Sequence, residues 1–178
     1  IRNTLTNAGT IAWSGTGNLQ VDYSSHDSYF GLIENLPGAV WDWQNNQNIL
    51  SGFNNGAYFR NAGLLVKSAG GGNSTISIPL LNSGEVSAIF GTILFNRGAT
   101  IEGRFQTGAS GAISFNSGAF NYTTAPVITG AGVTRVSGGT LTLLQDVIPN
   151  LQLASGTITL APGFQGGSIS NLTMLGGT

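Results

Sequence analysis

The chain has no cysteine and very little charge. Only 7 % of its 178 residues are charged, against roughly 25 % in an average soluble domain. Without cysteine, neither a disulfide nor a thiolate metal site can form. The net charge is −1 and Lys and Arg are not clustered, which argues against nucleic acid as a partner, because phosphate contacts need concentrated positive charge. No apolar run approaches the roughly 18 residues of a membrane-spanning helix, so we expect no membrane span.

Neutral polar residues take the place of the missing charges. Glycine occurs 28 times, and Asn, Ser, Thr and Gln supply most of the polar surface. This composition favours an extracellular protein, in which neutral polar ladders replace salt bridges, although any β-rich protein is rich in Ser, Thr and Gly. The length suits one sizeable core, and no linker is visible, so we expect a single domain over residues 1–178.

A short phrase of the form apolar-x-Asn-x-Gly-x-apolar recurs along the chain. It surrounds Asn7, Asn61 and Asn82, and a looser copy with one inserted residue surrounds Asn35. Asn61 and Asn82 lie 21 residues apart, which is the period of one coil of a stacked β-solenoid.

A second recurring unit is glycine followed by alternating apolar residues. It begins at Gly91, Gly111, Gly139 and Gly156. Each unit predicts a strand of about five residues with one face turned inward. Helical periodicity is absent, because Gly, Asn, Ser and Thr interrupt every candidate. The sequence therefore predicts an all-β fold, a parallel β-solenoid of about seven or eight irregular coils.

The repeated asparagines and glycines are best explained by structural turns and ladders. Glycine at a tight corner supplies a positive φ, and asparagine tolerates the left-handed region while its amide bonds the backbone. Stacked coils would also align the asparagines into a column of hydrogen-bonded amides. The residues assigned to this role are Asn7, Gly9, Asn61, Gly63, Asn82 and Gly84.

The first third of the chain, about residues 1–58, is irregular and rich in aromatic residues. It holds all three tryptophans, and an insert at residues 21–32 breaks the repeat. Sugar rings stack on Trp and Tyr, and protein partners use the same residues as anchors. The alternative is that these rings fill or cap the core. The candidates for carbohydrate or partner binding are Trp13, Tyr23, Tyr29, Trp41, Trp43 and Tyr58.

Catalytic chemistry has little support in the sequence. The seven carboxylates are scattered, whereas a glycosidase needs two that face each other. The best enzyme-like cluster is Asp22, His26 and Asp27, and a solvated polar loop is the alternative. We expect no catalytic residue, no metal site and no cofactor.

Two runs, FRNAGLLVKSAGGGNSTISIPLLNSGEV and ITGAGVTRVSGGTLTL, resemble the repeats of very large bacterial surface proteins. These are β-strand-repeat, haemagglutinin-like or autotransporter-like proteins, which form parallel β-helices. The resemblance covers most of residues 53–160. It implies secretion, a cell-surface or filament location and an adhesive or scaffolding role, and it carries over no active-site residue.

The function expected from these observations is that of a non-enzymatic extracellular structural or adhesive solenoid, such as a filament subunit, a stalk or an adhesin segment. One alternative is a carbohydrate-binding or carbohydrate-active β-helix. Another is an ice-binding solenoid, since Thr140-x-Thr142 and Thr157-x-Thr159 form Thr-x-Thr pairs one coil apart, although β-propensity on an exposed face explains them too. No polar capping helix is apparent at either end, and free strand edges invite another chain. We therefore expect self-association or continuation into a longer repeat protein.

Overall fold

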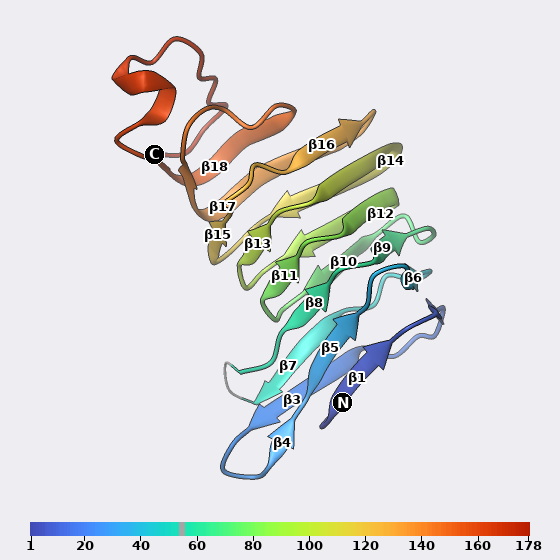
Figure 1. Cartoon of the computed structure of the whole chain (residues 1–178). Helices are drawn as coiled ribbons and strands as arrows, with labels where there is room; N and C mark the ends of the chain where they lie inside the picture. Colours follow the sequence, from blue (N-terminus) through green and yellow to red (C-terminus); the bar gives the residue numbers. More distant parts are fainter. Residues whose placement is uncertain (54–55) are drawn as a thin grey trace.

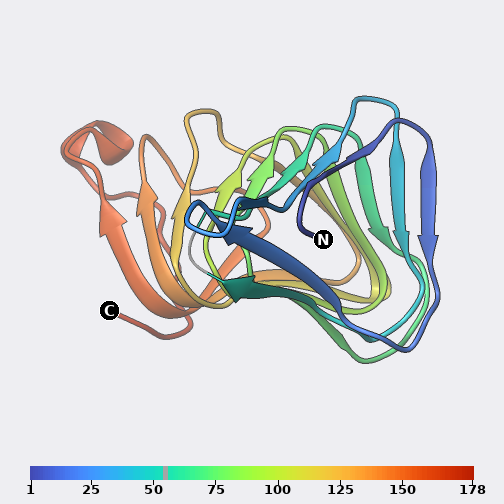
Figure 2. The same cartoon turned by 90° about the horizontal axis from the view of Figure 1, so that it is seen from below.

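The computed structural model describes residues 1–53 and 56–178. Strands make up 55 % of the structure and helices 2 %, and the strands stack in parallel into a β-solenoid of about six turns. Figure 1 shows the stack from the side and Figure 2 from below. The predicted fold class is confirmed. The turns are fewer than the seven or eight expected, because the first coils take 28 and 26 residues between equivalent asparagines and the last residues form an end segment.

Each coil of the stack has three sides, which we name A, B and C. Side A contains β1 (Thr4–Asn7), β5 (Leu32–Asn35), β8 (Phe59–Asn61), β11 (Leu80–Asn82), β13 (Ala99–Ile101), β15 (Ala119–Asn121) and the second halves of β17 (Val133–Leu143) and β18 (Leu151–Leu160). Side B contains β2 (Thr10–Trp13), β6 (Val40–Trp43), β9 (Leu64–Lys67), the first halves of β12 (Glu85–Phe95) and β14 (Arg104–Phe115), and β16 (Val127–Gly130). Side C contains β3 (Leu19–Ser24), β7 (Ile49–Phe53), β10 (Asn73–Ile76) and the remaining halves of β12, β14, β17 and β18.

The core consists of columns of side chains that rise through the stack in register. Residues that pair between neighbouring coils of one side point to the same face of the sheet. On side C one column runs through Leu19, Ile49, Ile76, Phe95, Phe115, Val136 and Leu153. All of its members are buried except the first, Leu19, which is half-buried. The rings of Phe95 and Phe115 stack with centroids 5.6 Å apart.

The expected positive φ is present at the recurring Gly91, Gly139 and Gly156, but Gly63 and Gly84, at the corners between sides A and B, have a different cause. Gly63 and Gly84 do not have a positive φ. A Cβ on Gly63 would lie 2.3 Å from the carbonyl oxygen of Ala39, and one on Gly84 would lie 2.2 Å from that of Gly63. Glycine is therefore needed because successive coils approach closely. The asparagines also avoid the left-handed region, so their expected role as left-handed turn residues is wrong, and their side chains point into the core.

Two features interrupt the regular stack. The insert predicted at residues 21–32 contains a hairpin in which β4 (Tyr29–Phe30) pairs antiparallel with the end of β3. At the other end, residues 161–178 contain the short 3-10 helix η1 (Phe164–Gly167) and lie beyond β18 (Figure 1). Among the described residues, no helix is long and apolar enough to cross a membrane.

Candidate functional site

A column of four asparagines runs through the first four coils on side A. The Nδ2 of Asn7 donates to Oδ1 of Asn35 at 2.8 Å, Asn35 donates to Asn61 at 2.8 Å, and Asn61 donates to Asn82 at 2.7 Å. Asn82 ends the column by donating to the backbone oxygen of Glu102 at 2.6 Å. All four residues are buried. The column expected from the repeated phrase is present, and every amide in it points the same way.

The N-terminal end of the solenoid exposes the start of the core. Leu5, Ile11 and Leu19 occupy the first positions of the columns on sides A, B and C, and each is only half-buried. Their counterparts in the second coil, Ile33, Trp41 and Ile49, are buried. An open apolar depression of about 190 Å³ lies between these first-coil side chains. This end therefore presents an uncovered layer of the hydrophobic core.

The three tryptophans do not form an exposed aromatic platform. Trp41 and Trp43 are buried, because alternate residues of β6 face the core. Trp13 is half-buried and stacks on Trp43, with ring centroids 5.0 Å apart and an interplanar angle of 22°. The indole Nε1 of Trp41 is buried with no hydrogen-bond partner among the described residues. Of the three rings, only that of Trp13 offers area to a ligand.

The three candidate tyrosines are half-buried and lie in two places. Tyr23 and Tyr29 belong to the β3–β4 hairpin, where Tyr23 makes an edge-to-face contact with Phe30 at 5.7 Å and the guanidinium of Arg2 lies 4.3 Å from the Tyr29 ring centroid. Tyr58 lies beside Arg60, whose guanidinium is 5.7 Å from the ring centroid. The structure therefore does not gather the six candidate aromatic residues into one site.

The acidic cluster of the hairpin divides into two separate networks. Asp22 is buried, accepts a hydrogen bond from Gln20 at 2.9 Å and pairs with Arg2 at 3.3 Å. These contacts, the Gln20 hydrogen bond first, hold the pKa of Asp22 below its usual value. Asp27 accepts a hydrogen bond from the Ser24 hydroxyl and lies 3.1 Å from exposed His26, and both contacts lower its pKa.

Asp27 and His26 match the solvated-loop alternative, whereas Asp22 is a buried carboxylate held by Gln20 and Arg2. Both carboxylates stay ionised because of ordinary hydrogen bonds, and neither is set up to exchange a proton near neutral pH. Among residues 1–53 and 56–178, no group of three or more His, Cys, Asp or Glu is placed to hold a metal ion.

The most unusual charged group, Lys67, was not singled out in the sequence. It is completely buried at the end of β9, in the column that contains Trp43. Its Nζ donates to the backbone oxygens of Asn45 and Ala69 and to Oδ1 of Asn46, at 2.5, 3.1 and 3.2 Å. Burial lowers the pKa of this ammonium. Because its partners are carbonyl oxygens in the corner between sides B and C, we interpret Lys67 as a structural tie.

The C-terminal end carries a non-repeating segment that covers part of the last coil, although Ile169 and Leu175 in this segment are themselves largely exposed. Phe164 of η1 is buried against the core. The side chain of Gln165 donates to Asp146 and to the backbone oxygen of Asn171, both at 2.7 Å, and accepts from the backbone of Ser170 and Asn171. The backbone of Leu175 donates to Leu153 at 2.7 Å, so the end segment also extends side C. No polar capping helix is apparent in the sequence at either end, and at this end the structure covers part of the core with the short η1 and its buried Phe164.

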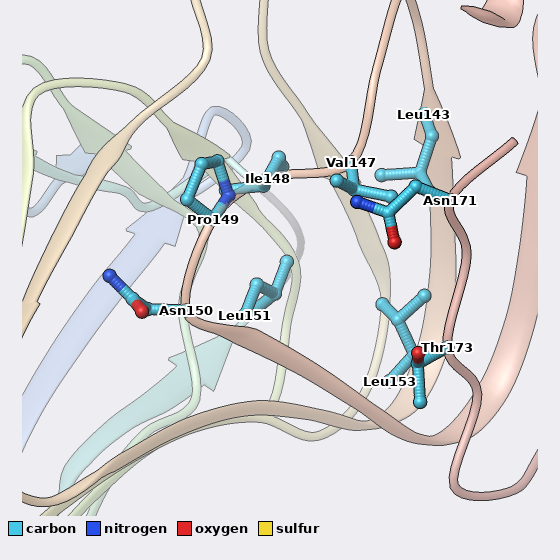
Figure 3. Close-up of a pocket in the computed structure, with 9 residues that line it drawn as sticks. All are labelled: Leu143, Val147, Ile148, Pro149, Asn150, Leu151, Leu153, Asn171 and Thr173. Atoms are coloured by element: carbon cyan, nitrogen blue, oxygen red, sulfur yellow. The ribbon is translucent and has the colours of Figure 1, made fainter.

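A pocket of about 330 Å³ lies under this end segment. Figure 3 shows residues 147–151 on one side of it and Asn171 and Thr173 on the other. The pocket forms where the chain makes a loop on side B instead of a strand that would follow β16. Its polar side chains are Asn150, Asn171 and Thr173, and its lining includes no ionisable group. The pocket therefore offers hydrogen bonds and apolar area but no acid, base or nucleophilic pair.

The two Thr-x-Thr pairs are exposed and in register. Thr140 pairs with Thr157 and Thr142 with Thr159 on side A. The preceding coil carries Ala119 opposite Thr140, so the array is interrupted there. This is a small patch compared with a whole solenoid face.

In comparisons with known proteins, no protein-family model, no curated protein and no solved structure matches the chain. The resemblance to bacterial surface-protein repeats therefore stays a prediction.

Proposed function

We propose that the chain is a structural segment of an extracellular or cell-surface protein, serving as a stalk, a filament subunit or an adhesin segment without enzymatic activity. The observation that supports this most directly is the uninterrupted parallel pairing of side C from β3 to β18. Stacked coils that share one core resist bending and extend in one dimension. The low charge and the neutral polar surface fit an extracellular location.

The location can be tested on intact cells of the organism that makes the protein. Antibodies against the chain and a protease added outside the cells should both reach it, and the protease should remove the antibody signal without lysis. A signal that survives the protease until the cells are broken would contradict the surface role. A periplasmic or cytoplasmic marker protein serves as the control for cell integrity.

Carbohydrate binding is the second candidate, because the half-buried Trp13 ring lines the open apolar depression. Aromatic rings of this kind stack on the apolar faces of sugars. A glycan array should then show binding that Trp13→Ala removes while the fold persists. Binding that is unchanged by Trp13→Ala, or no binding at all, would exclude this site. Trp41→Ala and Trp43→Ala are unsuitable tests because both rings are core residues.

A further inference from the structure

The corner glycine of the first coil has no structural reason within the described chain. Four corners between sides A and B have the same length, and their glycines are Gly9, Gly63, Gly84 and Gly103. A Cβ on the last three would lie 2.2 to 2.3 Å from a backbone oxygen of the preceding coil. A Cβ on Gly9 would meet no described heavy atom within 4 Å, and Gly9 does not have a positive φ. The close approach that requires glycine in the later coils is missing here.

The acceptor of the first asparagine in the column has a different donor from the acceptors of the later ones. The Oδ1 atoms of Asn35, Asn61 and Asn82 each accept from the asparagine of the preceding coil. Asn7 accepts instead from the backbone N–H of Gly9, two residues along its own chain, at 3.1 Å. In later coils the corresponding N–H groups of Gly63 and Gly84 donate to the backbone of the preceding coil. The N–H of Gly9 thus bonds within its own coil, whereas the N–H groups of Gly63 and Gly84 bond to the preceding coil.

The free edge of β3 already carries the start of another strand. The amino group of Ile1 donates to the oxygen of Gln20 at 2.5 Å, and the N–H of Asp22 donates to the oxygen of Ile1 at 2.8 Å. These two bonds place Ile1 opposite Val21 in parallel fashion. On the opposite edge of β3, the N–H of Leu19 donates to the backbone oxygen of Asn48 in the second coil. Ile1 therefore lies on the side of β3 that faces away from the stack.

From these three observations we infer that the N-terminal end is a docking surface for one more parallel β-coil, supplied by polypeptide joined to the amino end of Ile1. This coil carries an asparagine that donates to Oδ1 of Asn7, a backbone oxygen that approaches Gly9, and apolar residues over Leu5, Ile11 and Leu19. The inference rests on the proposed structural role and specifies what the rod continues into.

The polarity of the asparagine column excludes the other simple occupants. Two N-terminal ends placed face to face would set two Oδ1 acceptors of Asn7 against each other with no donor between them. The C-terminal end of a second copy would bring aliphatic side chains to this column, because Leu143 and Leu160 occupy its last positions. Only a coil with an amide donor in register completes the column.

The test is a chain extended by one coil. A copy of residues 59–77 joined to Ile1 sets the copied Ile76 opposite Leu19, because Ile1 lies opposite Val21, and brings the copied Asn61 to Asn7. A second extension uses a copy of residues 32–50, whose Ile49 pairs with Leu19 in the native stack. Each extended chain is compared with residues 1–178 by thermal unfolding and by acrylamide quenching of Trp fluorescence. Carrying Asn61→Leu in the grafted copy alone gives the matched control for the amide.

The expected result is a change in the effect of Gly9→Ala. In the unextended chain Gly9→Ala should shift Tm by less than about 2 °C, as a surface substitution does. In an extended chain it should lower Tm by about 5 °C, because the new Cβ meets backbone. Gly15→Ala, which also has no described atom nearby, should be neutral in both, and Gly84→Ala should be costly in both. Trp13 should become less accessible to acrylamide, and the Asn61→Leu graft should raise Tm less than the native graft.

The inference is overturned if neither extension protects Trp13, or if Gly9→Ala stays neutral in both extended chains. It is also overturned if the unextended chain associates with rising concentration and Gly9→Ala abolishes that association, because the occupant is then a second copy. The cell-surface test above is independent of these results. A failed extension would leave the extracellular role standing, and an intracellular location would leave the docking surface standing.

Discussion

The two ends of this solenoid terminate the same stack in different ways. At the N-terminal end, the first members of all three core columns remain half-exposed and Asn7 bonds to its own corner. At the C-terminal end, Phe164 is buried and Gln165 fastens the surrounding loop. The difference teaches that the repeats themselves do not close the stack. Among the described residues, a non-repeating segment with a buried aromatic ring covers part of the stack at the C-terminal end, where Ile158 and Leu160 of the last coil are still half-buried.

The largest expected effect is the difference in stability lost when a core side chain is truncated in the interior of the stack and at its open end. Phe115→Ala should lower the free energy of unfolding by about 3–5 kcal/mol, because it leaves a cavity in a closed column. Leu19→Ala removes a half-buried side chain at the end of the same column and should cost about 1 kcal/mol. Chemical denaturation of both variants measures the difference. Equal losses would mean that Leu19 is covered in solution.

The asparagine column should also lose more stability from a substitution in the interior than from one at the N-terminal end, with a smaller difference between the two. Asn61→Ala leaves the amide of Asn35 and the oxygen of Asn82 without their partners, at a cost of about 2–4 kcal/mol. Asn7→Ala removes one bond within the column, to Asn35, and should cost about 1 kcal/mol. Both values follow from urea unfolding curves. If Asn7→Ala lowers the free energy of unfolding as much as Asn61→Ala does, the first coil is covered by another coil in solution.

Loosening the C-terminal end should be a local event. Gln165→Ala removes the five side-chain hydrogen bonds that hold the loop, which should cost about 1–2 kcal/mol. Amide exchange in residues 161–178 should then accelerate while β12 and β14 keep their protection. Gln152→Ala, an exposed glutamine on β18, is the control. Exchange that accelerates throughout the stack would show that this end is required for the whole fold.

The smallest effect concerns the buried ammonium of Lys67. Burial lowers its pKa in the folded state, so the folded chain releases this proton before the unfolded chain does. Stability should therefore rise with pH between the lowered folded pKa and the ordinary unfolded value. Comparison with Lys67→Met isolates this rise from the ionisation of other groups. If the free energy of unfolding of Lys67→Met rises with alkaline pH as steeply as that of the native chain, this prediction is wrong.

The repeated phrases carried enough information to predict the solenoid and its asparagine column. Residues such as Asn61 and Gly63 repeat because each coil meets the same neighbour, so local pattern and global fold agree. The burial of Trp41 and Trp43 was left open, since a strand with alternating residues fits either an inward or an outward face until its register is known. Lys67 was missed because its partners are mostly backbone oxygens, which leave no signature in the sequence. The plug at Phe164 follows no repeat, so its position depends on tertiary contacts alone.

The length of the corners has a further consequence for how such a chain can vary. Five residues, 68–72, join β9 to β10, whereas three, 89–91, join the equivalent positions Ala88 and Thr92 of β12, and yet the two coils stay in register on both sides of this corner. One coil adds about 4.8 Å to the stack whatever its residue count. Extra residues widen the rod and leave its rise unchanged. Corners such as residues 68–72 are thus natural places to insert a foreign peptide, displayed at a height along the rod that is set by counting coils.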